Sequence, residues 1–413
     1  MPVYFRRIEV VGEVPSADVR GRLFVSNHVN GILDPILVFL TSACDISPVA
    51  KSTLWSVPVL RWLLGVVDSV RVVRRVDDPT KQGGSNDAAF EEVAAWLHRG
   101  GNILIFPEGT SHSQPHLVEI KTGAARMLRR ACELGSKEAL TMQSVAMEFD
   151  AREEARSRVL LIYGPVRRVA DLDTASDGFI GAATEMIRAD LSERLVEGAT
   201  WEDRRAIGLA AEMLANEAGD RSLAGWNLAG RRLEAAKRRG GATELFERAS
   251  ESLTAYGKAL SDLGVTDAEV AGVASFGVGR ALFLAAIAPL AAIGALGYAI
   301  PRWLTNRIAD RVKSKDETGT FRLGVALVFH PIWAVLCVTL SLALAPSPLC
   351  FGLAALALIC PFASIPWIDA SPEIGRRLRI WRAGSRLDEV KRARSAARSR
   401  VSELLGEMES ERG

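Results

Sequence analysis

The sequence predicts an α/β domain with a largely parallel central sheet flanked by helices, followed by a helical subdomain and C-terminal membrane helices. Three observations support this prediction. Short apolar runs alternate with helical patterns up to about residue 170. Residues 171–270 are rich in Ala, Glu, Arg and Leu at helical spacing. After residue 270 come long apolar segments that carry no charged residue.

Composition narrows the class of protein further. The chain has 413 residues, which is enough for roughly two or three domains. Its 51 Lys and Arg residues nearly balance 49 Asp and Glu residues, so the net charge of +2 argues against a nucleic-acid partner. The five cysteines have neither metal-ligand nor disulfide spacing, so we expect reduced thiols in a cytosolic environment and no metal site. The N-terminus lacks the continuous apolar region of a secretory signal.

The first predicted domain covers residues 1–170. Strands are predicted at 22–26, 70–73, 102–106, 143–149 and 158–163, and helices at 35–43, 86–99 and 122–134. The helix at 86–99 is the best marked, because Ser85, Asn86 and Asp87 are good capping residues and Gly100 follows its end.

The predicted helical subdomain, residues 171–270, has breaks near Gly198, Gly219 and Gly240. Its charge-dense helix faces are expected to be solvated surface. After it, residues 271–368 contain apolar segments at 281–300, 323–345 and 349–368, each long enough to cross a bilayer.

The basic residues on either side of the later apolar segments conflict with a single membrane crossing by 281–300. The connector 301–322 and the tail 369–413 are rich in Arg and Lys, so both are expected on the cytoplasmic side, with 323–368 forming a membrane hairpin. A single crossing by 281–300 would then separate the connector from a cytoplasmic first domain. We therefore expect Pro289 to break this segment into a re-entrant or interface-lying helix pair. The alternative is three buried core helices in a soluble protein.

Two other stretches leave alternatives open. The basic amphipathic tail helix, 369–413, suits either the lipid headgroups or a solvated helix. The run at 54–64 contains Trp55, Arg61 and Trp62. It suits an acyl-chain path, a segment dipping into the bilayer, or a plain buried helix.

Chemistry-bearing residues follow two of the predicted strands. His28 and Asp34 lie just after the run ending at residue 26, and Glu108 begins a Glu-Gly-Thr-Ser turn after the run ending at 106. Open α/β sheets bind ligands at these strand ends. A His with a nearby carboxylate can be a general base with its orienting partner, and the turn can offer donors to an anion. Alone, a His and an Asp at this spacing also arise readily by chance.

These motifs resemble those of a known family. Residues 27–35, then Arg74 and Arg75, then 106–111 and the strand at 143–149 follow the order of the four motif blocks of the glycerolipid acyltransferases. This family includes lysophosphatidic acid and glycerol-3-phosphate acyltransferases. Residues 106–125 most resemble the branch that acylates glycerol 3-phosphate or dihydroxyacetone phosphate. Two departures stand out: five residues instead of four separate His28 from Asp34, and Ser111 replaces a common Arg.

The resemblance implies a role for each matching residue. His28 would be the base and Asp34 its partner. Arg74 would bind the acceptor phosphate, with Arg75 as its neighbour. Glu108 and Gly109 would shape the acceptor site. Further candidates for substrate binding are Asn30, Lys51, Thr110, Ser111 and Lys121. For both lysines the alternative is ordinary surface solvation. For Thr110 and Ser111 the alternative is capping of the turn. His112 and His116 are expected on the surface of the loop.

The implied activity is that of a membrane-bound O-acyltransferase in phospholipid synthesis. It would move a fatty acyl group from acyl-CoA or acyl carrier protein to a hydroxyl of glycerol 3-phosphate or 1-acylglycerol 3-phosphate, with no other cofactor. The expected partners are membrane lipids, a phosphorylated glycerol acceptor and an acyl thioester donor, at a cell membrane with the catalytic domain facing the cytoplasm. The alternatives are acylation of dihydroxyacetone phosphate or another lysolipid, or a non-catalytic lipid-binding scaffold.

Overall fold

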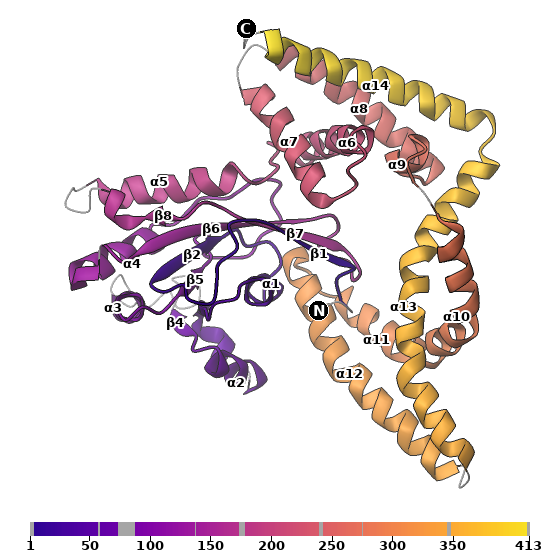
Figure 1. Ribbon diagram of the computed structural model, residues 1–413, viewed down its shortest axis with the longest axis horizontal. Coiled ribbons are helices and arrows are strands. Elements are labelled where there is room, and N and C mark those ends of the chain that lie inside the picture. The colour runs from indigo at the N-terminus through magenta and orange to yellow at the C-terminus, as the bar shows by residue number, and fades with distance from the viewer. Residues whose placement is uncertain are drawn as a thin grey trace. The chain divides into compact units, whose positions relative to one another are not determined.

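The computed structural model describes residues 4–56, 58–72, 87–136, 138–172, 178–238, 243–274, 276–344 and 348–410 (Figure 1). The chain divides into two compact units. The first unit comprises Ile8–Asp150 and Val159–Glu197, and the second comprises Met1–Arg7, Ala151–Arg158 and Gly198–Gly413.

A mixed, mostly parallel sheet forms the centre of the first unit, in the strand order β1-β7-β6-β2-β5-β3-β4, with β8 also paired to β6. The pairs β2–β5, β2–β6, β3–β4 and β3–β5 are parallel, whereas β7 and β8 run antiparallel to β6. The strands are β1 (Arg7–Gly12), β2 (Arg22–Ser26), β3 (Ser47–Lys51), β4 (Val70–Val72), β5 (Ile103–Ile105), β6 (Thr141–Phe149), β7 (Arg158–Tyr163) and β8 (Arg167–Arg168). The predicted fold class is therefore confirmed, although β1, β3 and β8, which lack a marked apolar run, were not predicted.

The first unit also contains helices, several of which complete the core of the sheet. They are α1 (Leu33–Thr41), α2 (Pro58–Val66), α3 (Asp87–His98), α4 (Gly123–Ala131) and α5 (Phe179–Ser192), with short turns η1 (Ser52–Ser56), η2 (Cys132–Ser136) and η3 (Val169–Asp171). Side chains of α3, α4 and α5 are buried together with those of β2 and β5, for example Leu97, Leu128 and Ile187 with Leu23 and Ile103. Burial of such side chains is the main stabilising term of the unit.

The first unit extends further along the chain than the expected boundary at residue 170. Helix α5 lies in the stretch that the sequence assigns to the helical subdomain. Its residues Phe179, Ala183, Ile187 and Leu191, each four positions apart, are instead buried in the core of the first unit.

Helices α6 (Trp201–Glu217), α7 (Leu223–Arg238), α8 (Thr243–Leu263) and α9 (Asp267–Val270) belong to the second unit, together with the C-terminal helix α14 (Ser385–Ser410). Helix α14 packs against α8 and buries Val390, Ala397, Val401 and Leu404. Its apolar stripe is therefore covered by protein, a packing that neither alternative for the tail, a helix on headgroups or a solvated helix, included.

Charged groups also hold α14 in place. The Arg394 Nε atom lies 2.7 Å from Asp267 Oδ1. Asp267 has no exposed surface and also accepts hydrogen bonds from the Tyr256 hydroxyl at 2.7 Å and the Asn216 amide at 2.8 Å. A buried carboxylate needs such partners, so this network ties α14 to α6, α8 and α9.

The apolar segments after residue 270 form α10 (Val278–Gly297), α11 (Ala299–Ala309), α12 (Lys315–Leu344) and α13 (Pro348–Arg382). Three of these, α10, α12 and α13, are long and apolar enough to cross a membrane. Only 17%, 0% and 22% of their most apolar windows are buried, so the alternative of buried core helices in a soluble protein is wrong. The predicted hairpin reversal at Pro346 and Ser347 lies outside the described residues.

The expected break at Pro289 is also wrong, because α10 continues through this residue. Proline removes one hydrogen bond of the helix ladder, a loss that packing against neighbouring helices can offset in a membrane. Close packing is present here: a Cβ atom at Gly294 would lie 2.0 Å from the carbonyl oxygen of Cys360 in α13. The helix ends instead at Tyr298, where α11 begins.

Candidate active site

The loop after β2 places His28 at the carboxyl end of that strand. Asn27 fixes the loop to β6, since its side-chain amide donates to the Met147 carbonyl at 3.0 Å and its side-chain oxygen accepts from the Met147 N–H at 2.8 Å. Gly31 then adopts a positive φ of 53°, which suits glycine and turns the chain into α1. His28 is thereby held beside the first turn of α1.

Asp34 lies in this first turn, has no exposed surface, and contacts the His28 ring. Its Oδ2 atom is 2.9 Å from His28 Nδ1, and it also accepts the backbone N–H groups of Val29 and Asn30, both at 2.8 Å. The extra residue between His28 and Asp34 therefore does not prevent their contact. Because a carboxylate only accepts, Nδ1 carries the ring proton and Nε2 keeps a lone pair.

The His28 ring is partly accessible, with 19% of its side chain exposed. Its other neighbour is Phe106, the residue after β5, whose ring stacks on the imidazole with centroids 4.1 Å apart. Stacking on one side and the hydrogen bond to Asp34 together restrict the orientation of the ring. The imidazole is thus fixed while part of it stays open to a substrate.

Glu108 joins the two motifs. Its carboxylate is buried, and Oε1 accepts the backbone N–H of His28 at 2.7 Å while Oε2 accepts that of Val118 at 3.1 Å. Gly109 next to it has a φ of 74°, so the turn after β5 depends on glycine at this position. Glu108 therefore fixes the backbone of His28, and both of its carboxylate oxygens accept hydrogen bonds from the protein.

His112 also belongs to this network, which the sequence did not predict. Its Nε2 atom contacts the Glu108 carboxylate, and its backbone N–H donates to the His28 carbonyl at 3.2 Å. Its Nδ1 atom accepts the Gln114 N–H at 3.1 Å, so Nε2 is the protonated nitrogen that donates to Glu108. Only 11% of the side chain is exposed, and the expected loop-surface position is wrong. The sequence signal was a His four residues after the Glu.

For the remaining candidates, the structure gives the following positions. Asn30 is buried, and its backbone contacts Asp34. Thr110 is exposed and donates its hydroxyl to the Ser111 carbonyl at 3.2 Å. Lys121 is exposed and paired with Glu119, as its surface alternative expects, although a Cβ atom at Gly109 would lie 3.8 Å from its Cγ.

Lys51 is half-buried at the end of β3. Arg74 and Arg75, the candidates for phosphate binding, lie outside the described residues. Within the part of the chain that the structure describes, no group of three or more His, Cys, Asp or Glu side chains could hold a metal ion. None of the five cysteines, all of which lie in the described residues, forms a disulfide bond.

Fold and site together define a class: an α/β domain in which a partly exposed histidine contacts a buried aspartate at the carboxyl ends of parallel strands. Residues 7–148 match the family profile described as Acyltransferase. The matched residues make up about a third of the chain and include His28, Asp34 and Glu108.

Several characterised proteins resemble parts of the chain. It is 35% identical over 79 residues to glycerol-3-phosphate O-acyltransferase 2 of Saccharomyces cerevisiae, covering 19% of this chain and 11% of that protein. It is 31% identical over 144 residues to lyso-ornithine lipid O-acyltransferase of Pseudomonas aeruginosa, covering 34% and 47%. It is 28% identical over 123 residues to the chloroplastic 1-acyl-sn-glycerol-3-phosphate acyltransferase LPAT1 of Arabidopsis thaliana, covering 30% and 32%. The chain thus spans less than half the length of each.

Among solved structures, the 1-acyl-sn-glycerophosphate acyltransferase PlsC from Thermotoga maritima superposes with a TM-score of 0.34 at 16% identity, covering 45% of this chain and 70% of that one.

Proposed function

We propose that this chain is a membrane-bound O-acyltransferase of phospholipid synthesis. It moves a fatty acyl group from acyl-CoA or acyl carrier protein to a hydroxyl of glycerol 3-phosphate or 1-acylglycerol 3-phosphate. The observation that carries the proposal is the 2.9 Å contact of the His28 ring with the buried Asp34, in a domain that matches the Acyltransferase profile. The thioester is the co-substrate, and the reaction uses no further cofactor.

The proposed reaction begins with the lone pair on His28 Nε2. This nitrogen takes the proton of the acceptor hydroxyl while the hydroxyl oxygen attacks the thioester carbonyl carbon. Asp34 keeps Nδ1 protonated and stabilises the imidazolium that forms. When the tetrahedral intermediate collapses, the carbon–sulfur bond breaks and the imidazolium returns its proton to the leaving thiolate. An ester and a free thiol result, with no acyl-enzyme.

Acceptor binding is proposed from the family resemblance. Arg74 would hold the acceptor phosphate through its bidentate guanidinium, with Arg75 beside it. Lys51, Thr110, Ser111 and Lys121 are further proposed contacts near the acceptor. Lys121 is supported by its position next to Gly109 in the turn after β5.

We also propose that the soluble parts of the chain share the cytoplasmic side of a cell membrane. Contacts in the second unit support this arrangement of α12 and α13. The Tyr4 hydroxyl donates to the Gly319 carbonyl at 3.0 Å near the start of α12, and Arg156 pairs with Asp369 in α13 at 2.6 Å. Both ends of the α12–α13 hairpin are thereby attached to soluble segments of one unit.

The course of α10 and α11 supports a re-entrant pair. Helix α10 starts with Arg280 paired to Glu373 at 2.9 Å, and it ends where the Tyr298 hydroxyl donates to the Ala357 carbonyl at 3.2 Å. Along α13, Ala357 lies twelve residues, or about 18 Å, from Asp369. A hydrocarbon core is roughly 30 Å thick, so this distance is too short for a full crossing. Helix α11 then leads back to Asp310, which pairs with Arg322 of α12 at 3.3 Å.

Protease protection in sealed vesicles tests this topology. We expect the connector 301–322 to be cleaved in inverted vesicles and protected in right-side-out vesicles, together with the tail. Cleavage of the connector from the outer face alone would contradict the proposal.

The acceptor is tested with membranes that contain the full chain, a labelled acyl thioester and a panel of acceptors. We expect labelled product with glycerol 3-phosphate or 1-acylglycerol 3-phosphate that is lost in His28→Ala. Labelling of dihydroxyacetone phosphate or another lysolipid instead would favour the alternative acceptors, to which the lyso-ornithine lipid relative draws attention. No labelling above the variant would favour a non-catalytic scaffold, although the intact contact between His28 and Asp34 argues against it.

A further inference from the structure

Helix α2 of the first unit is apolar, yet the unit leaves much of it uncovered. The exposed fractions of Trp62, Leu63 and Val66 are 68%, 46% and 63%. Among its nine residues, Pro58–Val66, the only charged side chain is Arg61. A helix that is apolar on nearly every side is normally buried, yet the described residues of this unit do not cover α2. The sequence alternative of a plain buried helix is wrong.

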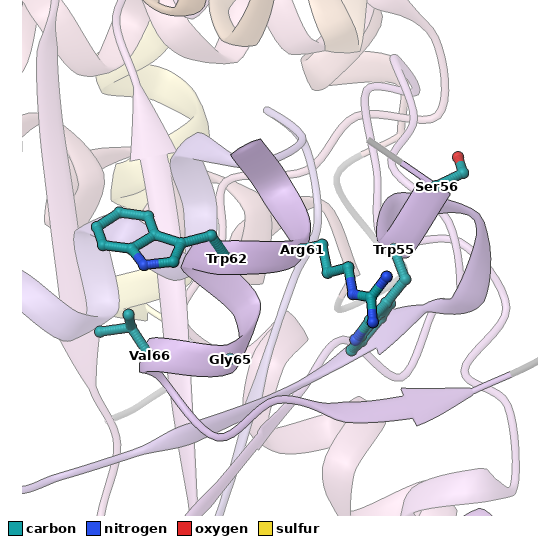
Figure 2. A pocket seen from close by; sticks show the side chains of 6 residues that line it. All are labelled: Trp55, Ser56, Arg61, Trp62, Gly65 and Val66. Atoms are coloured by element: carbon teal, nitrogen blue, oxygen red, sulfur yellow. The ribbon is translucent and has the colours of Figure 1, made fainter. Parts of the chain in front are cut away.

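The side chains around α2 have the character of a lipid interface. Figure 2 shows Trp62 and Val66 on one side of the helix and Arg61 directed towards Trp55. The guanidinium of Arg71 lies 5.9 Å from the centre of the Trp55 ring. Residues 51–67 contain Lys51 and Arg61 and no acidic residue. Tryptophan and basic side chains next to an apolar helix are typical of segments that lie in the headgroup region of a bilayer.

We propose that α2 inserts its Trp62 and Val66 side into the headgroup region of an anionic bilayer. The catalytic domain would then make its own membrane contact, separate from the membrane helices of the second unit. A lipid partner fits better than a second protein because the chain carries helices long enough to cross a membrane, and because the basic residues beside α2 complement acidic lipid headgroups. This inference stands apart from the proposed acyl transfer.

The test uses the full chain in lipid nanodiscs of mixed phosphatidylcholine and phosphatidylglycerol. An environment-sensitive fluorescent amino acid replaces Leu63 in one sample and Leu134, which is 44% exposed in the same unit, in the control. We expect spin-labelled lipid to quench the probe at 63 at least twofold more than the probe at 134. Aqueous iodide should quench the two in the opposite order.

Equal quenching of both probes by iodide, with none by the lipid quencher, would overturn the proposal. Protection at 63 that appears only when two copies share a disc would also overturn it, in favour of self-association.

Reversing the charge of Arg61 tests the attraction between α2 and acidic lipid headgroups. In Arg61→Glu we expect lipid quenching at 63 to fall by half or more, and the effect of phosphatidylglycerol to shrink. Arg126→Glu reverses an exposed arginine on α4 of the same unit and should leave this quenching unchanged. Equal losses in the two variants would contradict a specific lipid contact of α2. The readout needs no catalytic activity, so it can fail or succeed independently of the proposed reaction.

Discussion

The Nδ1 atom of His28 lies 2.9 Å from Oδ2 of Asp34, across a loop one residue longer than the common spacing of the family. The loop accommodates this residue through the positive φ of Gly31, while the N–H groups of Val29 and Asn30 turn towards the same carboxylate oxygen. The contact needed to orient a general base is therefore kept, and several predictions rest on it.

Replacing Asp34 tests the orientation of the base. In Asp34→Asn the charge that stabilises the imidazolium is lost, and the amide can favour the wrong ring tautomer. We expect kcat to fall on the order of 10²-fold or more, with KM changed little, in steady-state acyl-transfer assays. A thermal melt on the same preparation checks that the fold is kept. An Asp34→Asn enzyme with full kcat would show that the contact is only structural.

Replacing Glu108 tests its role as the link between the two motifs. Glu108→Gln places an N–H₂ group against the N–H donors of His28 and Val118, or leaves one of them without an acceptor. We expect a loss of about 1–3 kcal/mol in stability, measured as a lower melting temperature of the purified chain. Glu119→Gln changes an exposed carboxylate in the same loop and should have little effect. Equal melting temperatures for both variants would contradict the linking role.

His112 is predicted to act through Glu108 as a positioning residue. In His112→Phe the carboxylate loses a donor, so we expect kcat to fall on the order of tenfold, equivalent to about 1.4 kcal/mol, without a matching change in KM. His112→Gln can still donate from its amide and should recover most of this loss. Equal activity of the Phe and Gln variants would show that the hydrogen bond to Glu108 does not matter.

The second unit should lose stability as the pH rises towards neutrality. Burial raises the pKa of Glu212 to about 7, with repulsion from Asp267 in the same direction and attraction to Arg158 opposed. A raised pKa favours the protonated form in the fold, so this contribution is complete below about pH 4.3 and is lost as the pH rises through about 7. The upper limit of this contribution is about 4 kcal/mol.

Melting temperatures between pH 5 and 8 check this prediction. Glu212→Gln should flatten the decline, whereas Glu202→Gln, an exposed residue of the same helix, should keep it. The same slope in both variants would assign the decline to other groups.

The features that could be predicted from the sequence were those that depend on neighbouring residues. Alternating apolar runs indicated the parallel sheet, and the motif spacing indicated His28, Asp34 and Glu108 as one site. The role of His112 depends on the turn at Gly109, which brings its ring back to the Glu108 carboxylate. No local pattern shows such a return of the chain.

The differences from expectation outside the site also involve contacts between distant residues. Pro289 is accommodated within α10 because α13 packs closely at Gly294. The tail helix α14 is covered by α8, since Val401 and its apolar neighbours are buried in the second unit. Single-residue propensity at Pro289, or amphipathicity alone in the tail, does not reveal which element packs against it.

Single-turnover transfer from a labelled acyl thioester in membranes measures whether His28 is the base for acyl transfer to a phosphorylated glycerol. With glycerol 3-phosphate or 1-acylglycerol 3-phosphate as acceptor, His28→Ala should transfer the acyl group 10²- to 10⁴-fold more slowly than the unaltered chain, on the order expected for loss of a general base. Transfer at the unaltered rate by a folded His28→Ala protein would contradict the account.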